Sequence, residues 1–237
     1  MTKVEGRFKG FPAEAFDFFK KLSRHNNREW FLKNKVAYQE SLLEPMKRLV
    51  EDVDEELRKQ GIPLRRNARS SVQRIYRDIR FSADKTPYYT FIAAAFYFEG
   101  DKSRPGVLYI HFDNEHPFFA AGFWHPDAQF LTALRTKLGE NPEAFEKVLK
   151  KLERAGYEFS QEGSLSRMPR GFERFADSPL AKFFKMKSFV VSERLETADL
   201  YKKNLITRIT SFTGKALPLL EFGWALQPPE TSDFQDV

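Results

Sequence analysis

The chain has 237 residues, of which 41% are hydrophobic, and it carries a formal net charge of +6. Its hydrophobic residues are spread along the whole length, which argues for a folded globular protein and against intrinsic disorder. There is no cysteine, so disulfides, thiolate metal sites and cysteine nucleophiles are excluded. No stretch approaches the roughly 18 apolar residues of a membrane span, and no apolar run follows the first residues. We therefore expect a cytoplasmic protein without a signal peptide or membrane segment.

The first quarter of the chain is predicted to be helical. An apolar stripe at helical spacing predicts one helix over residues 12–24. Asn26 and Glu29 have the three-residue spacing of a capping box, so a second helix is expected to begin there and to end before Gly61. Trp30 and Phe31 lie close to its start and can line a site, but core packing is the expectation for both, because buried aromatic residues at a helix start are usually structural.

Three runs in the middle of the chain are typical of strands, over residues 91–99, 107–114 and 118–125. Turn-rich segments separate them, so an antiparallel meander is the natural arrangement. In the second run, apolar residues alternate with Tyr109, His111 and Asp113. That alternation predicts a sheet with one buried face and one more polar face.

The remainder is predicted to be mainly helical. The expected elements are helices from residue 126 and over 142–154, a short helix over 178–186 and a strand over 189–193. A final helical region is expected from residue 197 to about 226, with a break near Gly214 or Pro218.

Helices, then strands, then helices indicate the α+β class. No repeat or linker divides the chain, so we predict a single domain over residues 1–237. Its antiparallel β-meander sheet is expected to be flanked by N-terminal and C-terminal helices. Residues 1–5 and 228–237 are expected to be frayed tails.

The positive charge is concentrated in two regions. Residues 65–90 contain seven Lys and Arg against two Asp, and residues 182–215 contain eight Lys and Arg against three acidic residues. The rest of the chain is mildly acidic. Two basic regions suggest attraction to an anion, such as a phosphate group or nucleic acid. Two solvated basic faces are an equally good interpretation.

The stretch 74–88 is the densest in chemically useful groups, and its local conformation is ambiguous. Its Ile and Tyr residues favour a strand with Ile75, Ile79 and Phe81 on one side. Such a strand leaves on its other side Arg74, Tyr76, Asp78 and Arg80. Residues 82–87 are then expected to form a loop, because a proline favours an extended residue before it.

The basic side chains of this stretch can bind an anion. They belong to Arg74, Arg77, Arg80 and Lys85. Guanidinium groups match the oxygens of phosphate or carboxylate groups, and lysine adds a point charge. The sequence thus predicts a site for an anionic ligand, such as a phosphorylated one. Alternatively, Asp78 and Asp84 pair with these bases and fix the loop to the body of the protein.

A second candidate lies where the third predicted strand ends. Trp124 can stack on a planar ligand, and His125 can transfer a proton. An enzyme that uses Asp78 and His125 is therefore one alternative function. An aspartate among arginines should have a lowered pKa, however, which makes it a poor general acid at neutral pH. The structural alternative is a polar corner covered by the tryptophan.

A nucleic-acid-associated protein is the other alternative. Aromatic residues that can stack on bases accompany the arginines, and they are Tyr76, Tyr88, Tyr89 and Trp124. No known nucleic-acid recognition motif is visible, however.

No metal or cofactor is predicted. The grouped residues His111, Asp113, Glu115 and His116 lack the HExxH spacing and straddle a strand and a turn. The Walker A and GxGxxG patterns are also absent.

The central stretch fits the pattern RxxRDxRFxxxKxPY. The fixed positions are filled by Arg74, Arg77, Asp78, Arg80, Phe81, Lys85, Pro87 and Tyr88. In this pattern the sequence resembles a mainly bacterial family labelled DUF2461, a domain of unknown function. The resemblance extends over nearly the whole chain, including residues 26–31 and 122–126.

One departure from that family is visible. Relatives often read Lys-Thr-His after the Pro-Tyr pair, whereas this chain has Tyr89-Thr90-Phe91. The resemblance implies no activity, substrate or cofactor, but it favours the motif as a site. The predicted ligand-binding residues are Arg74, Arg77, Asp78, Arg80, Lys85, Tyr88, Trp124 and His125.

Overall fold

A computed structural model describes residues 7–67, 71–160 and 163–226. It contains a five-stranded sheet with the order β1-β2-β3-β4-β5, in which all neighbouring strands are antiparallel. The strands are β1 (Leu64–Arg66), β2 (Ile92–Phe98), β3 (Val107–Phe112), β4 (Phe118–Phe123) and β5 (Phe189–Arg194). The predicted α+β class and antiparallel meander are confirmed. The tails predicted at 1–5 and 228–237 lie outside the described residues.

Helices flank the sheet, as predicted. The α-helices are α1 (Ala15–Arg24), α2 (Arg28–Tyr38), α3 (Glu44–Lys59), α4 (Ala128–Glu140), α5 (Pro142–Arg154), α6 (Ala181–Phe184) and α7 (Leu205–Trp224). The π-helical turn η1 (Gln39–Leu43) joins α2 to α3, and the short 3₁₀ turns are η2 (Glu173–Phe175) and η3 (Thr197–Asp199). The helix expected from residue 26 to 60 is thus a nearly continuous series of three pieces.

The final helix differs from the prediction. It starts at Leu205 rather than 197, and α7 continues through Gly214 and Pro218 without a break. A proline in a helix interior costs about 3 kcal/mol. Burial of one face of α7, which includes Ile209, Leu219 and Leu220, offsets that cost, because tertiary packing supplies most of the stability of a helix in a protein.

The alternation in β3 produces the two predicted faces. Leu108, Ile110 and Phe112 are fully buried, whereas Tyr109 and His111 between them are only partly buried. On the buried face, α3 contacts β1 and β2, and α7 contacts β4. Large phenylalanines fill this core, among them Phe96, Phe112, Phe119, Phe123, Phe189 and Phe212.

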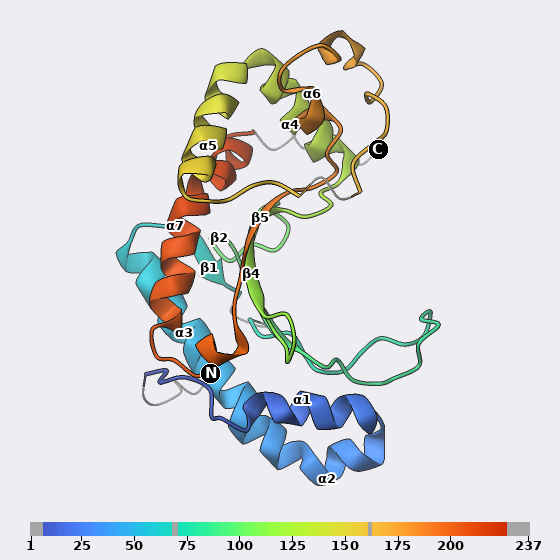
Figure 1. Cartoon of the computed structure of the whole chain (residues 1–237), viewed down its shortest axis with the longest axis vertical. Coiled ribbons are helices and arrows are strands. Elements are labelled where there is room, and N and C mark those ends of the chain that lie inside the picture. Colours follow the sequence, from blue (N-terminus) through green and yellow to red (C-terminus); the bar gives the residue numbers. More distant parts are fainter. Residues whose placement is uncertain (1–6, 68–70, 161–162, 227–237) are drawn as a thin grey trace, which may run out of the picture.

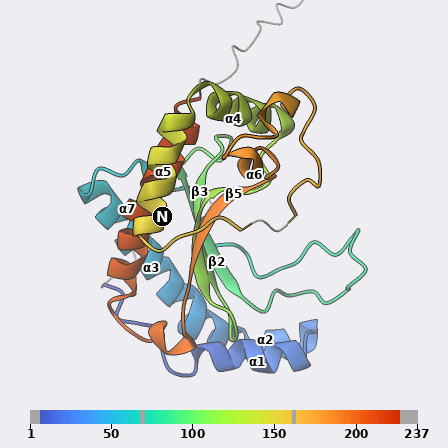
Figure 2. The ribbon, with the colours of Figure 1, turned by 45° about the horizontal axis from the view of Figure 1, so that its top comes forward.

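The two sides of the sheet differ in the ribbon. Helices α3, α5 and α7 lie on one side, and a long teal-to-green hairpin loop between β1 and β2 projects on the other (Figures 1 and 2). The pair α1 and α2 lies at one end of the sheet, whereas α4 and α6 lie at the opposite end. This arrangement exposes the more polar face of the sheet on the side of the projecting loop.

Candidate functional site

The predicted motif forms that projecting loop, and we call residues 74–90 the arm. Tyr76 forms an antiparallel bridge with Tyr88. The amide of Arg77 donates to the carbonyl of Pro87 at 2.9 Å, and the amide of Tyr89 donates to the carbonyl of Ile75 at 2.8 Å. The arm is therefore a two-stranded antiparallel ribbon that continues β1 and β2 beyond the sheet.

The extended conformation of the motif is thus as predicted, but the placement of Phe81 is not. Ile75 is buried at 4% exposure, whereas the Phe81 side chain at the tip is 95% exposed. The reason is the turn at the tip, where the amide of Ser82 approaches the carbonyl of Ile79 at 3.4 Å. This turn reverses the chain before Phe81 can share the buried side of Ile75.

The base of the arm is fixed to α2 by an aromatic stack, which we call the root. The rings of Phe31 and Tyr88 are stacked with their centroids 4.2 Å apart, and Tyr76 lies 5.4 Å from Tyr88. Tyr88 is 4% exposed. Although it was predicted to bind a ligand, Tyr88 is placed here as an anchor of the arm, and burial raises the pKa of its hydroxyl.

Asn26 completes the root by imitating a neighbouring strand. Its side-chain amide donates to the carbonyl of Tyr88 at 2.8 Å, and its side-chain oxygen accepts from the amide of Tyr88 at 3.1 Å. The predicted capping box of Asn26 and Glu29 is consequently wrong. Asn27 caps α2 by accepting from the amide of Trp30 at 3.0 Å.

Arg77 braces the interior of the arm. Its Nη1 donates to the Asp84 carboxylate at 2.5 Å, to the Thr86 carbonyl at 2.9 Å and to the Thr86 hydroxyl. Hydrogen bonds from Thr86 and from Arg77 hold the pKa of Asp84 below its usual value. The Arg77 side chain is only 18% exposed. Arg77 and Asp84 therefore pair within the arm and fix its shape, whereas the structural alternative expected the aspartates to fix the loop to the body of the protein.

The other cations of the arm project into solvent. Arg80 forms an ion pair with Asp78 at 2.7 Å, and the two side chains are 76% and 52% exposed. Arg74 and Lys85 are also exposed, and Lys85 donates to the Ile79 carbonyl at 3.0 Å. Hydrogen bonds from Arg80, aided by the charge of Arg74, lower the pKa of Asp78. The expected low pKa of this aspartate is confirmed, so it stays ionised and is a poor general acid.

Trp124 and His125 lie away from the root of the arm. They follow β4, whose last residue Phe123 pairs with Phe189. The arm instead joins β2 at the end of the sheet where Ile92 pairs with Phe112. Trp124 is 71% exposed, and its ring meets that of His125 edge-on at 4.6 Å. Within the described residues, no contact joins His125 to Asp78.

Sequence analysis missed a further cluster, on the sheet face that points away from the helices. We call it the open face, and it is built around Phe91, Tyr97, Tyr109, His111 and Phe118. The ring of His111 lies 4.4 Å from Phe91 and 4.9 Å from Phe118. The alternation in β3 was the available signal, but only the register across β2, β3 and β4 brings the rings together.

His111 has two polar neighbours on the open face. Its Nε2 lies 3.4 Å from the Asp113 carboxylate, and its Nδ1 lies 3.3 Å from the Tyr109 hydroxyl. Burial lowers the pKa of His111, and Asp113 partly opposes that shift. Over the ranges that the structure describes, no three His, Cys, Asp or Glu side chains are grouped to hold a metal ion.

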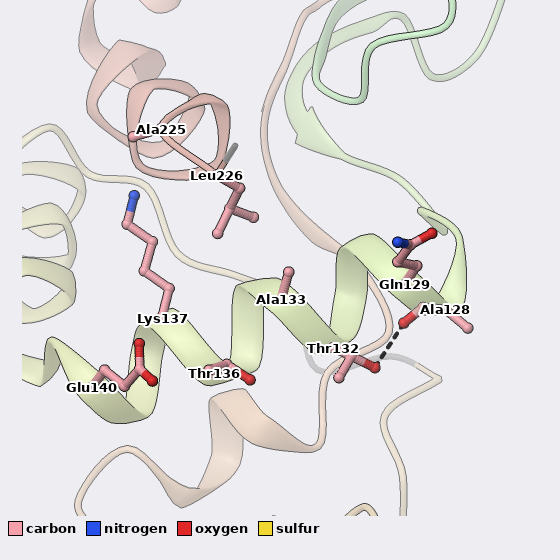
Figure 3. A pocket seen from close by; sticks show the side chains of 9 residues that line it. All are labelled: Ala128, Gln129, Thr132, Ala133, Thr136, Lys137, Glu140, Ala225 and Leu226. Atoms are coloured by element: carbon pink, nitrogen blue, oxygen red, sulfur yellow. Dashed lines mark hydrogen bonds between the residues drawn. The ribbon is translucent and has the colours of Figure 1, made fainter. Parts of the chain in front are cut away.

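A shallow groove lies elsewhere, between α4 and the end of α7 (Figure 3). It is lined by Ala128, Gln129, Thr132, Ala133, Thr136, Lys137, Glu140, Ala225 and Leu226. Its single basic group, the Lys137 amine, already donates to the carbonyl of Phe222 at 2.8 Å. The groove contains none of the predicted site residues, so we do not place the ligand there.

A comparison with known protein families identifies the family of this chain. A family model described as "Conserved hypothetical protein (DUF2461)" matches residues 14–222. The chain belongs to the DUF2461 family. No curated protein and no solved structure is significantly similar to this DUF2461 member. The family is uncharacterised, so membership confirms the resemblance noted above but assigns no ligand. Among the helices of the described ranges, none combines the length and the apolar character needed to cross a membrane.

The hydrogen bonds of Arg77 to Asp84 and Thr86 are expected to hold the arm closed. Replacing Arg77 with Ala removes the hydrogen bonds to Asp84 and Thr86, so the arm should open more often. Losing one hydrogen bond to a charged group typically costs at least about 1.5 kcal/mol, which corresponds to at least about tenfold. We therefore expect trypsin to cleave after Arg80 or Lys85 at least about tenfold faster in Arg77→Ala than in the wild type. An unchanged cleavage rate would show that the brace does not hold the arm.

Proposed function

We propose that this DUF2461 protein is a binding protein whose arm holds an anionic, phosphate-bearing ligand. The supporting observation is that only one of two exposed arginines, Arg80, pairs with the exposed carboxylate of Asp78. Arg80 uses Nε and Nη2 toward Asp78, whereas Arg74 makes no hydrogen bond or ion pair with the described part of the chain. A guanidinium group has five donors, so most donors of this pair remain available to a ligand.

Different residues of the motif fix the shape of the arm and present positive charge, and this also supports the proposal. The Arg77 brace and the Phe31–Tyr88 stack fix the shape of the arm without using Arg74, Arg80 or Lys85. The exposed cations are therefore presented on a ribbon with a defined shape, which reduces the ordering cost of binding. Within this proposal the protein is cytoplasmic, as the absence of cysteine favours.

Isothermal titration calorimetry with tripolyphosphate at low salt tests the proposal. We expect the double variant Arg74→Ala/Arg80→Ala to bind at least about tenfold more weakly than the wild type, because each charge-assisted hydrogen bond contributes about 1.5–3 kcal/mol. The matched control is Lys150→Ala/Arg154→Ala, which removes two exposed positive charges from α5. Absence of binding to the wild type, or equal weakening in both double variants, would refute the proposal.

A further inference from the structure

The open face has a composition unlike that of an ordinary solvated sheet. Tyr109 on β3 stands directly between Ala95 on β2 and Ala120 on β4. Alanine is much smaller than tyrosine, so the sides of the Tyr109 ring are not crowded by its cross-strand neighbours. The face therefore presents a large, partly buried ring between two small residues, of which Ala95 is partly exposed and Ala120 is buried.

The rings of the open face form a row that leads to the arm, and Tyr109 adjoins this row at 6.0 Å from His111 and 6.1 Å from Phe118. Tyr89 lies 4.8 Å from Phe91, Phe91 lies 4.4 Å from His111, and His111 lies 4.9 Å from Phe118. The Arg77 guanidinium lies 5.9 Å above the Tyr89 ring. All of these rings are partly exposed. The aromatic row of the open face and the arm therefore meet at Tyr89.

Charge on this side of the sheet favours an anion. The pairing of β4 with β5 places Arg194 opposite Phe118, on the open face. The Arg194 side chain is exposed. The exposed arginines and lysine of the arm lie beyond the other end of the aromatic row. Burial lowers the pKa of His111, and the carboxylate of Asp113, which faces the imidazole at 3.4 Å and opposes that shift, is the acidic group beside the row.

We infer that the open face is a stacking platform for single-stranded nucleic acid, whose bases lie on the aromatic row while arginines at both ends hold its phosphates. The phosphate contacts of the arm rest on the function proposed above, whereas the base contacts rest on the sheet alone. A polymer fits better than a single nucleotide, because the row is several rings long and cations lie at both of its ends. Stacking of this kind is how many proteins bind single strands without reading their sequence.

Fluorescence anisotropy with a labelled oligothymidine of about 15 nucleotides tests this inference. At about 50 mM salt we expect binding that weakens steeply as salt is raised, and weaker binding of the matching duplex, whose bases are not free to stack. Tyr109→Ala should weaken binding of the oligonucleotide by roughly 5- to 100-fold, the range for loss of one stacked base. Tyr109→Phe should retain it, because the ring remains.

The control is Tyr201→Ala, which removes a partly buried tyrosine that packs against Phe16 of the helical layer. If Tyr109→Ala is too unstable to assay, photocrosslinking of the wild-type protein to an oligonucleotide with 5-bromouracil replaces it. Crosslinks should then map to residues 89–118. Crosslinks confined to other regions, equal effects of Tyr109→Ala and Tyr201→Ala, or no binding of the oligonucleotide would overturn the inference.

The two proposals fail in different ways. If tripolyphosphate binding depends on Arg74 and Arg80 but oligonucleotide binding is insensitive to Tyr109→Ala, the arm binds anions and the platform is refuted. If the oligonucleotide depends on Tyr109 while tripolyphosphate does not bind, the platform is supported and the anion-binding function of the arm is refuted. If both proposals hold, Arg74→Ala/Arg80→Ala should also change the salt dependence of oligonucleotide binding. The slope of the logarithm of the binding constant against the logarithm of the salt concentration should become shallower by about one for each arginine removed.

Discussion

Replacing Phe31 with Ala is expected to destabilise the fold by about 3–5 kcal/mol and to release the arm. Phe31 is 1% exposed. Its ring stacks on Tyr88 at 4.2 Å and also lies 5.9 Å from Tyr76, so it contacts both strands of the arm. Truncation leaves a cavity under the root and removes both contacts. Urea unfolding should show the loss of global stability, and hydrogen exchange should report the opening of the arm.

The exchange reporters are the amides of Arg77 and Tyr89, which close the two strands of the arm. Their protection should fall in Phe31→Ala by an amount that approaches the global loss of stability, because opening of the arm breaks the contacts that the substitution removes. The control is Phe119→Ala, which removes an equally buried ring that packs against Phe212 at 5.0 Å in the helical layer. It should cost a similar free energy without a selective effect on the arm. If both variants affected these amides equally, the root would not be the anchor.

A second large effect is expected at the join between β4 and β5. Gly122 has φ +138°, and a Cβ at this position would collide with the carbonyl oxygen of Phe189. In Gly122→Ala the two strands must separate locally, in addition to the strain of the unfavourable φ. Backbone strain and overpacking each cost about 1–3 kcal/mol, so we expect a combined loss of about 2–6 kcal/mol in the free energy of unfolding.

Gly156→Ala provides the matched control for that substitution. Gly156 also has a positive φ, +81°, but no atom lies within 4 Å of the place that an added methyl group would take. Only strain remains there, and we expect a loss of about 1 kcal/mol. Chemical denaturation of the two variants separates strain from collision. Equal losses would mean that the close approach of β4 and β5 is relieved at little cost.

Sequence reasoning succeeded where the signal is local. The strands β2 to β5 are visible as short runs of strand-favouring residues. In β3 the side chains also alternate with period two. It missed β1, since Leu64–Arg66 is too short to show any period. It also placed a break in α7 at Pro218, because packing against the core, which decides the outcome there, depends on residues far away in the chain.

In the candidate site, too, the sequence identified the residues but not their orientation, which depends on the tertiary structure. Composition and the family pattern identified the functional groups of the arm, but they did not separate Arg77 from Arg80. Both have an aspartate nearby in sequence, and only the turn at the tip decides that Arg77 faces inward to Asp84 while Arg80 faces solvent with Asp78. The open face escaped notice for a related reason, since its rings come from three strands and meet only through the register of the sheet.

In the described part of the chain, the contacts that tie the arm to the body of the protein lie at its base, which gives the arm the mechanics of a lever. Its pivot is the contact of Tyr88 with Phe31 and Asn26, and its free end is Phe81. The Arg77 brace stiffens the ribbon between these two points, so the tip and the pivot must turn together. By geometry alone, any rotation about this pivot displaces Phe81 further than it displaces Tyr88.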